Sequence, residues 1–240
     1  MRSTITRTYI NLTGFAFVDD ADTIQTGMKG QQPEEVLHKA QKQLGLWEQL
    51  IRATGGGLDG DKSDFAIVGF EWKRGKWEYR KKKEGDKLTV RNGDKTEPLK
   101  QLGPSESRRT LGVWQAIDGN EDKQTEKMTE KAEEWARSIA RSSLTRSDTI
   151  LGAKTSLYPS ITYGLSATTL SKQQSKEVFK PIRKGVLGKT GYAKTMPETI
   201  VHGPETYGGI GLKDIYSLQG GSHISRHSLM RQGPIHQPGH

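Results

Sequence analysis

The hydrophobic and polar positions of the N-terminal segment predict a β-hairpin followed by a helix. Residues 13–18 and 21–26 are rich in Phe, Val, Thr and Ile, and Asp19 and Asp20 stand between them. A short polar pair between two such segments is typical of a hairpin turn. Pro33 then begins a helix, since its missing N–H costs nothing at the first helical position. The apolar face of this helix contains Val36, Leu37, Ala40, Leu44, Trp47, Leu50 and Ile51.

The pattern changes from strands to helices in the middle of the chain. Strands are expected around residues 65–72, 76–80, 87–91 and 110–114, joined by glycine turns. From about residue 120 onwards, apolar residues recur at helical spacing, at Met128, Ala132, Trp135, Ala136, Ile139 and Leu144.

Further helices are expected over residues 153–168, with a bend at Pro159, and over residues 171–187. After Pro197 the glycine content rises, which predicts a flexible C-terminus. The pattern therefore predicts an α+β fold. Residues 1–115 would form an incomplete antiparallel sheet with one packed helix, and residues 116–240 a mainly helical region.

The charge of the chain is strongly positive and unevenly distributed. The net charge is +9, and residues 141–240 hold 13 Lys and Arg against 5 Asp and Glu. Residues 72–92 hold 9 basic and 3 acidic residues, including the run Arg80, Lys81, Lys82 and Lys83. Because basic side chains bind phosphates and release counterions, this run is a candidate nucleic-acid-binding segment. A solvated hairpin face is the alternative interpretation.

Composition excludes several classes of site. The chain contains no cysteine, which excludes disulfides, thiolate nucleophiles and cysteine-ligated zinc. No apolar run approaches the roughly 20 residues of a membrane-spanning helix, and the N-terminus lacks the features of a secretory signal. We therefore expect an intracellular protein without membrane contact, in the nucleus or the cytoplasm.

Known motifs for nucleotides and metals are matched only in part. GGGLDGDKS resembles a phosphate-binding loop, but Asp61 separates Gly60 from Lys62, and the segment follows a helix rather than a strand. A calcium loop that starts at Asp59 would lack the required Gly and Glu. His223 and the histidine one turn later lack a third zinc ligand, and YGGIGL lacks the third glycine of a dinucleotide-binding loop.

The adjacent carboxylates Asp19 and Asp20 have two interpretations. Two carboxylates at a hairpin tip repel each other at neutral pH, and a divalent metal ion bound by hard oxygen ligands would offset that repulsion. Alternatively, the two residues cap a turn.

The order of these features resembles reverse transcriptases of retroelements that lack long terminal repeats. Phe17-Val18-Asp19-Asp20 is similar to their catalytic signature, which is an aromatic residue, any residue and two aspartates between short apolar strands. An amphipathic helix, Leu58 with Lys62-Ser63, strands, Leu111-Gly112-Val113 and a helical region then follow in the family's order. LYPSITYGLSATTLS resembles the thumb and post-thumb segment, so the resemblance covers about residues 12–220.

The resemblance implies an RNA-directed DNA polymerase that uses an RNA template, a DNA primer and deoxynucleoside triphosphates. Asp19 and Asp20 would be catalytic and would bind Mg²⁺ or Mn²⁺ in a two-metal site. Lys62 would approach the pyrophosphate and act as a general acid. Leu111 and Gly112 would form a primer-grip-like turn, and basic strands and helices would follow the template and primer backbones.

One departure from the family limits the expected activity. Residues 1–18 contain neither Asp nor Glu, although these polymerases need a further metal-binding aspartate on an earlier strand. We therefore expect a C-terminal portion of a reverse transcriptase, with partial palm and helical thumb, that is inactive alone. Two alternatives stay open: a non-catalytic basic nucleic-acid-binding module derived from a retroelement, and a product that does not fold stably.

Overall fold

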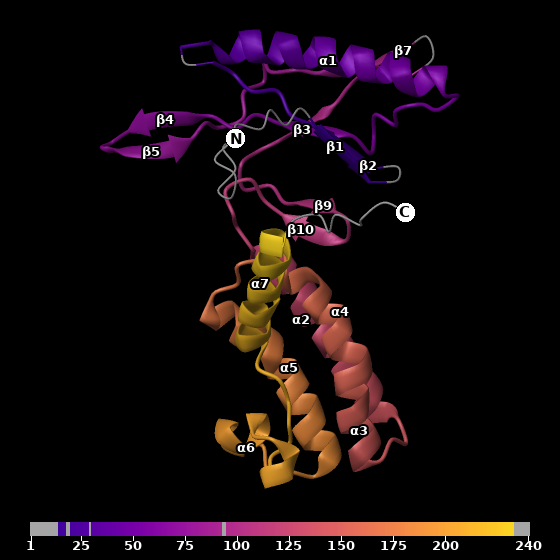
Figure 1. The fold of residues 1–240 in the computed structure, drawn as a ribbon, viewed down its shortest axis with the longest axis vertical. Coiled ribbons are helices and arrows are strands. Elements are labelled where there is room, and N and C mark those ends of the chain that lie inside the picture. The colour runs from indigo at the N-terminus through magenta and orange to yellow at the C-terminus, as the bar shows by residue number, and fades with distance from the viewer. Residues whose placement is uncertain (1–13, 18–19, 29, 93–94, 233–240) are drawn as a thin grey trace. The chain divides into compact units, whose positions relative to one another are not determined.

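The chain forms an α+β fold of two compact units (Figure 1). The computed structural model describes residues 14–17, 20–28, 30–92 and 95–232. Unit 1 is Met1–Glu106 and unit 2 is Ser107–His240. The predicted α+β class is confirmed. The boundary between the two units lies before residue 115, where the sequence predicts it. The reason is that residues 108–115 form a β-hairpin that is hydrogen-bonded to helices of unit 2.

Unit 1 combines the helix α1 (Pro33–Ala53) with eight short strands among its described residues. The strands are β1 (Gly14–Phe17), β2 (Asp20–Thr23), β3 (Asp64–Ala66), β4 (Phe70–Lys73), β5 (Lys76–Tyr79), β6 (Thr89–Asn92), β7 (Lys95–Pro98) and β8 (Lys100–Leu102). β1–β2, β4–β5 and β6–β7 are antiparallel hairpins, and β3 pairs with β8 in parallel. The described strands thus form separate two-stranded sheets instead of the single sheet expected from the sequence.

Polar side chains of α1 bind the backbone of β6. The Gln41 amide donates to the Thr89 carbonyl at 2.9 Å and accepts from the Thr89 N–H at 2.8 Å. Glu48 accepts from the Arg91 N–H at 2.8 Å. These bonds satisfy backbone groups at the edge of a strand. Beside them lies the small core of unit 1, Leu88, Val90 and Leu99 with Leu37, Ala40, Leu44, Leu58 and Phe65.

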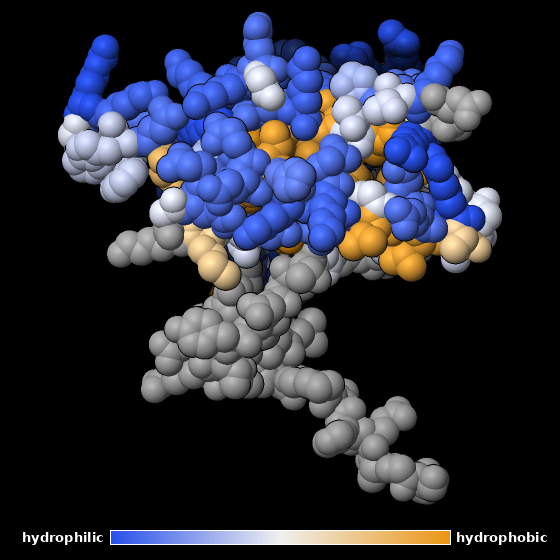
Figure 2. All heavy atoms as spheres, turned by 90° about the horizontal axis from the view of Figure 1, so that it is seen from above, coloured by the Kyte–Doolittle hydropathy of each residue, from blue (hydrophilic) through white to orange (hydrophobic). Residues whose placement is uncertain are grey.

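The face of unit 1 seen in Figure 2 is largely hydrophilic, with hydrophobic side chains between the charged ones. Leu46 and Leu50 of α1 are among the exposed apolar residues of this unit. The apolar stripe predicted for α1 is therefore only partly covered, since Leu37, Ala40 and Leu44 contact the core and Leu50 does not.

Unit 2 joins one hairpin to a helical bundle. The hairpin is β9 (Arg108–Thr110) with β10 (Val113–Gln115). The helices are α2 (Asp122–Arg141), α3 (Arg146–Gly152), α4 (Tyr158–Leu165), α5 (Lys172–Thr190), α6 (Glu198–His202) and α7 (Ile215–Gln232), with a 3₁₀ turn at Glu205–Tyr207. Their shared core includes Met128, Leu157, Ile161, Leu165, Val178, Ile182, Val186 and Ile215. The single strand predicted over residues 110–114 is thus a hairpin turn between two strands.

Two local features distinguish the helices of unit 2. A Cβ on Gly185 of α5 would lie 2.9 Å from the Ala136 Cβ on α2, so the α2–α5 contact requires glycine there. A π-helical turn at Ala153–Leu157 precedes Pro159, where the sequence predicts a bend, and the Tyr158 N–H donates to the Ala153 carbonyl.

The helix α7 replaces the flexible C-terminal segment that the glycine content predicts. Asp214 accepts hydrogen bonds from the N–H and the hydroxyl of Ser217 at 2.9 and 2.7 Å. Gln219 accepts from the Leu170 N–H at 2.9 Å and donates to the Leu170 carbonyl at 3.1 Å. With Ile215 fully buried, this docking outweighs the low helix propensity of Gly220 and Gly221. Residues 233–240 lie outside the described residues.

Candidate nucleic-acid interface and metal site

The β1–β2 hairpin places the predicted metal-binding pair at its connection. Gly14 pairs with Thr23 and Phe17 pairs with Asp20, which is the first residue of β2. A Cβ on Gly14 would lie 2.7 Å from the Asp22 carbonyl oxygen, so the close strand contact requires glycine. Asp19 lies outside the described residues, as does the side chain of Asp20. The hairpin prediction is confirmed, and metal binding by this pair stays a prediction.

Among the described residues, no three His, Asp or Glu side chains come together as metal ligands. Lys62, the predicted general acid, lies in the loop before β3 and is highly exposed. Its Nζ forms an ion pair with Asp59 at 2.9 Å. The hydrogen bond that Lys62 donates to Asp59 raises the pKa of Lys62, which keeps the ammonium group protonated. The ionic partner that the structure describes for Lys62 therefore lies in the same loop.

The basic run after β5 divides into one buried and three exposed side chains. Arg80 is 5% exposed and forms an ion pair with Asp86 at 2.9 Å. Gln101 also donates to Asp86, at 3.4 Å. Lys81, Lys82 and Lys83 are exposed. Arg80 is therefore a structural group inside unit 1, and the part of the run that can reach phosphates is Lys81–Lys83.

Leu111 and Gly112 form the turn between β9 and β10. Both have positive φ, 48° and 84°, which is the backbone of a two-residue hairpin turn and is unusual for leucine. The Tyr163 hydroxyl of α4 donates to the Leu111 carbonyl at 2.7 Å. The Trp114 N–H donates to Gln124 of α2 at 2.9 Å. The predicted primer-grip residues are thus held in an exposed turn fixed to two helices of unit 2.

A row of lysines lies on the solvent-exposed surface of α5. Lys172, Lys176, Lys180 and Lys184, here called the lysine row, stand at every fourth position and are all exposed. Since an α-helix rises 1.5 Å per residue, neighbours in the row are about 6 Å apart along the axis, and the row is about 18 Å long. The acidic residue of α5, Glu177, accepts a hydrogen bond from Gln173 at 3.2 Å.

The charges of α2 differ from those of the lysine row because they neutralise one another. Lys123 pairs with Glu126 at 2.8 Å and Lys127 with Glu130 at 2.6 Å. Within the described residues, no carboxylate forms an ion pair with the lysine row. The four-residue spacing and the buried face of α5, which includes Val178, Phe179, Ile182 and Val186, were both readable from the sequence, but the ion pairing was not.

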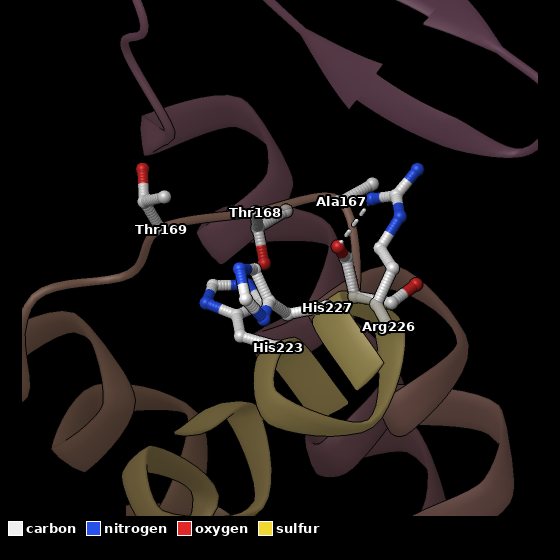
Figure 3. A pocket seen from close by; sticks show the side chains of 7 residues that line it. Ala167, Thr168, Thr169, His223, Arg226 and His227 are labelled. Atoms are coloured by element: carbon white, nitrogen blue, oxygen red, sulfur yellow. Dashed lines mark hydrogen bonds between the residues drawn. The ribbon is translucent and has the colours of Figure 1, made fainter. Parts of the chain in front are cut away.

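A shallow pocket on unit 2 lies between α7 and the loop of residues 166–169 (Figure 3). Arg226 donates to the Ser166 carbonyl at 2.7 Å. His223 and His227, one helical turn apart, lie beside Thr168, whose buried hydroxyl has no hydrogen-bond partner among the described residues. In the described part of the chain the two imidazoles have no third His, Asp or Glu ligand, so the pocket is not a zinc site of the usual kind.

Comparison with known proteins gives no family for this chain. No protein-family model, curated protein or solved structure matched it. Within the described residues, no helix is long and apolar enough to cross a membrane. The resemblance to reverse transcriptases therefore remains a prediction from the residues of the chain.

Proposed function

We propose that this chain is the C-terminal portion of an RNA-directed DNA polymerase from a retroelement without long terminal repeats. In this proposal the β1–β2 hairpin carries two metal-binding carboxylates of the palm. Unit 2 is the thumb-like part that holds the duplex of template and primer.

The lysine row of α5 is the observation that carries the duplex-binding part of the proposal. Duplex nucleic acid carries one negative charge per ≈1.7 Å of its axis, so the ~18 Å row spans about ten phosphate charges. Four exposed ammonium groups along one helix can contact several of these phosphates at once. Such contacts position a duplex without reading its sequence, as a polymerase requires.

The remaining predicted residues have roles in the intact enzyme. Mg²⁺ or Mn²⁺ would activate the primer hydroxyl and neutralise the leaving pyrophosphate when bound. Asp19 and Asp20 would hold the metal, and Lys62, which keeps its proton, would donate to the pyrophosphate. The exposed Leu111–Gly112 turn would support the primer end. Because residues 1–18 contain no carboxylate, a further metal-binding aspartate has to come from outside these 240 residues, and the isolated chain should not extend a primer.

The DNA upstream of the Met1 codon tests this proposal. We expect a coding sequence for an aspartate-bearing strand and a preceding basic region, in frame and either open or interrupted by stop codons. An open frame would indicate an intact polymerase gene, and an interrupted one a relic. Upstream DNA with no reading frame of this kind, open or interrupted, would contradict the proposal.

A second function is favoured by the same lysine row. The chain could persist as a non-catalytic nucleic-acid-binding module, because counterion release depends on Lys and Arg and not on Asp19. Duplex binding that survives Asp19→Asn, together with an interrupted upstream frame, would favour this function over the polymerase.

A further inference from the structure

The β4–β5 hairpin presents four aromatic rings on one face. Phe70 pairs with Tyr79 and Trp72 pairs with Trp77, and alternation along each strand places these four rings on the same side. The ring centroids are 4.8 Å apart in the first pair and 5.2 Å apart in the second. Trp72 and Trp77 are nevertheless 58% and 67% exposed. The rings contact each other across the strands; Phe70, Trp72 and Trp77 are each more than half exposed, whereas Tyr79 is partly buried.

The opposite face of the hairpin is charged and internally neutralised. Lys73 pairs with Glu71 at 2.5 Å and Lys76 pairs with Glu78 at 3.1 Å. Cross-strand aromatic pairs stabilise a hairpin, which accounts for the ring–ring contacts. However, the described core of unit 1 includes no residue of β4 or β5, and these strands form a sheet of their own (Figure 1). The aromatic face is therefore not part of the described hydrophobic core.

Cationic side chains stand at both ends of this hairpin. Arg74 lies in the exposed turn at the tip, where φ is 51° and the following Gly75 has φ of 81°. At the base, the Arg80 N–H donates to the Gly69 carbonyl at 2.8 Å, and the buried Arg80–Asp86 ion pair fixes this end. Lys81–Lys83 follow directly and are exposed.

We propose that the β4–β5 hairpin binds single-stranded nucleic acid by stacking unpaired bases on Trp72 and Trp77. Arg74 and Lys81–Lys83 would contact the phosphates on either side. Exposed aromatic rings next to cations are the combination by which proteins hold single strands, because every base offers a stacking face and the contact tolerates any sequence. The bases of a duplex are already stacked, so the expected ligand is a single strand. This inference does not rest on the proposed polymerase function, since it uses neither Asp19 nor the lysine row.

Tryptophan fluorescence of the full chain tests the proposal directly. Oligouridylate RNA and oligodeoxythymidylate of about 12 nucleotides are titrated at about 50 mM salt. We expect both to bind and to quench the fluorescence, because the bases stack on the indoles. Trp72→Phe with Trp77→Phe keeps a ring at each position, so binding should persist while the quenching is lost. RNA binding without DNA binding would restrict the ligand to RNA and retain the stacking site.

Alanine variants measure the contribution of the rings. The double substitution Trp72→Ala with Trp77→Ala should lower the affinity for both oligonucleotides by at least about tenfold and leave the affinity for the hybrid duplex unchanged. Tyr207→Ala, which removes a highly exposed ring from unit 2, is the matched control and should change neither. Glutamine at residues 81, 82 and 83 should lower affinity and its salt dependence while the quenching persists.

Three outcomes would overturn the inference. The first is unchanged fluorescence of the wild-type chain at saturating oligonucleotide, and the second is equal affinity in the double alanine variant. The third is a wild-type chain that binds no oligonucleotide but associates with itself, with the association lost in the double alanine variant. This result would make the aromatic face a contact between copies of the chain. If the wild-type chain binds the oligonucleotides but does not bind the hybrid duplex, the result contradicts the proposed function and leaves this inference standing.

Discussion

Arg80 and Lys81 are neighbours in one basic run but lie in opposite environments. The side chains of Arg80 and Asp86 are 5% and 6% exposed, whereas Lys81 is exposed. A buried guanidinium is tolerated when it is paired and hydrogen-bonded, and Asp86 supplies this pairing. The run therefore combines an anchor for the base of the β4–β5 hairpin with three cations that are free to contact a ligand.

At the residue scale, Arg80→Ala should destabilise unit 1 by about 3–5 kcal/mol, because it leaves the Asp86 carboxylate buried without its partner. Urea unfolding of the full chain, followed by tryptophan fluorescence, measures the change. Lys82→Ala is the control, and we expect it to change the free energy of unfolding by less than about 0.5 kcal/mol. Equal effects of the two substitutions would contradict the structural role of Arg80.

The sequence predicted the positions of charge at this scale but not their burial. Asp86 lies six residues after Arg80, so a possible ion-pair partner was visible in the sequence. Whether the two side chains meet depends on how the loop between them folds. Likewise, Leu111-Gly112 was expected as a turn, but the positive φ of Leu111 was not. Leucine rarely adopts this backbone, so the strain became visible only with the β9–β10 register.

At the scale of elements, long periodic segments were predictable and docked segments were not. The helix at Pro33–Ala53 follows from its apolar stripe and its N-terminal proline, and the hairpin β1–β2 from its two apolar segments. The helix α7 has Gly220 and Gly221 in its interior, and its formation depends on contacts with residues distant in sequence, such as Gln219 with Leu170. Local propensity cannot reveal such contacts.

The first turn of α7 should be sensitive to acid. Burial raises the pKa of Asp214, but the hydrogen bonds from Ser217, together with the nearby His202 and a backbone hydrogen bond from Tyr216, outweigh this effect and hold the pKa below its ordinary value. A carboxyl with a lowered folded pKa stabilises the fold above its unfolded pKa, and the contribution is lost as pH falls through the folded pKa. Asp214→Ala should therefore cost about 1 kcal/mol at neutral pH.

Asp214→Asn separates capping from titration, since asparagine also caps a helix but does not ionise. The free energy of unfolding, measured between about pH 6 and pH 3, should fall less steeply for Asp214→Asn than for the wild type. Parallel curves would show that the carboxylate of Asp214 does not contribute to the acid sensitivity.

At the scale of the whole molecule, the two units differ in how their interiors are built. Unit 2 has an extended hydrophobic core, whereas the described core of unit 1 is built on three buried apolar residues and depends on hydrogen bonds from α1 to β6. The change from strands to helices was readable from periodicity. The pairing of β3 with β8 and the attachment of β9–β10 to unit 2 are long-range contacts, which periodicity does not encode.

Both proposed functions require that the chain binds a nucleic-acid duplex through α5. The most direct measurement is the affinity for an RNA–DNA hybrid of about 20 base pairs as a function of salt concentration, for the wild type and for a variant with glutamine throughout the lysine row. Glutamine at Lys123 and Lys127, whose charges are paired on α2, is the control.

We predict tight binding of the wild type at about 50 mM salt. The slope of the logarithm of the binding constant against the logarithm of the salt concentration should become shallower by roughly 3 to 4 when glutamine replaces the lysine row. The α2 control should change the slope by less. An unchanged slope in the lysine-row variant, or no binding of the wild type at this salt concentration, would contradict the account.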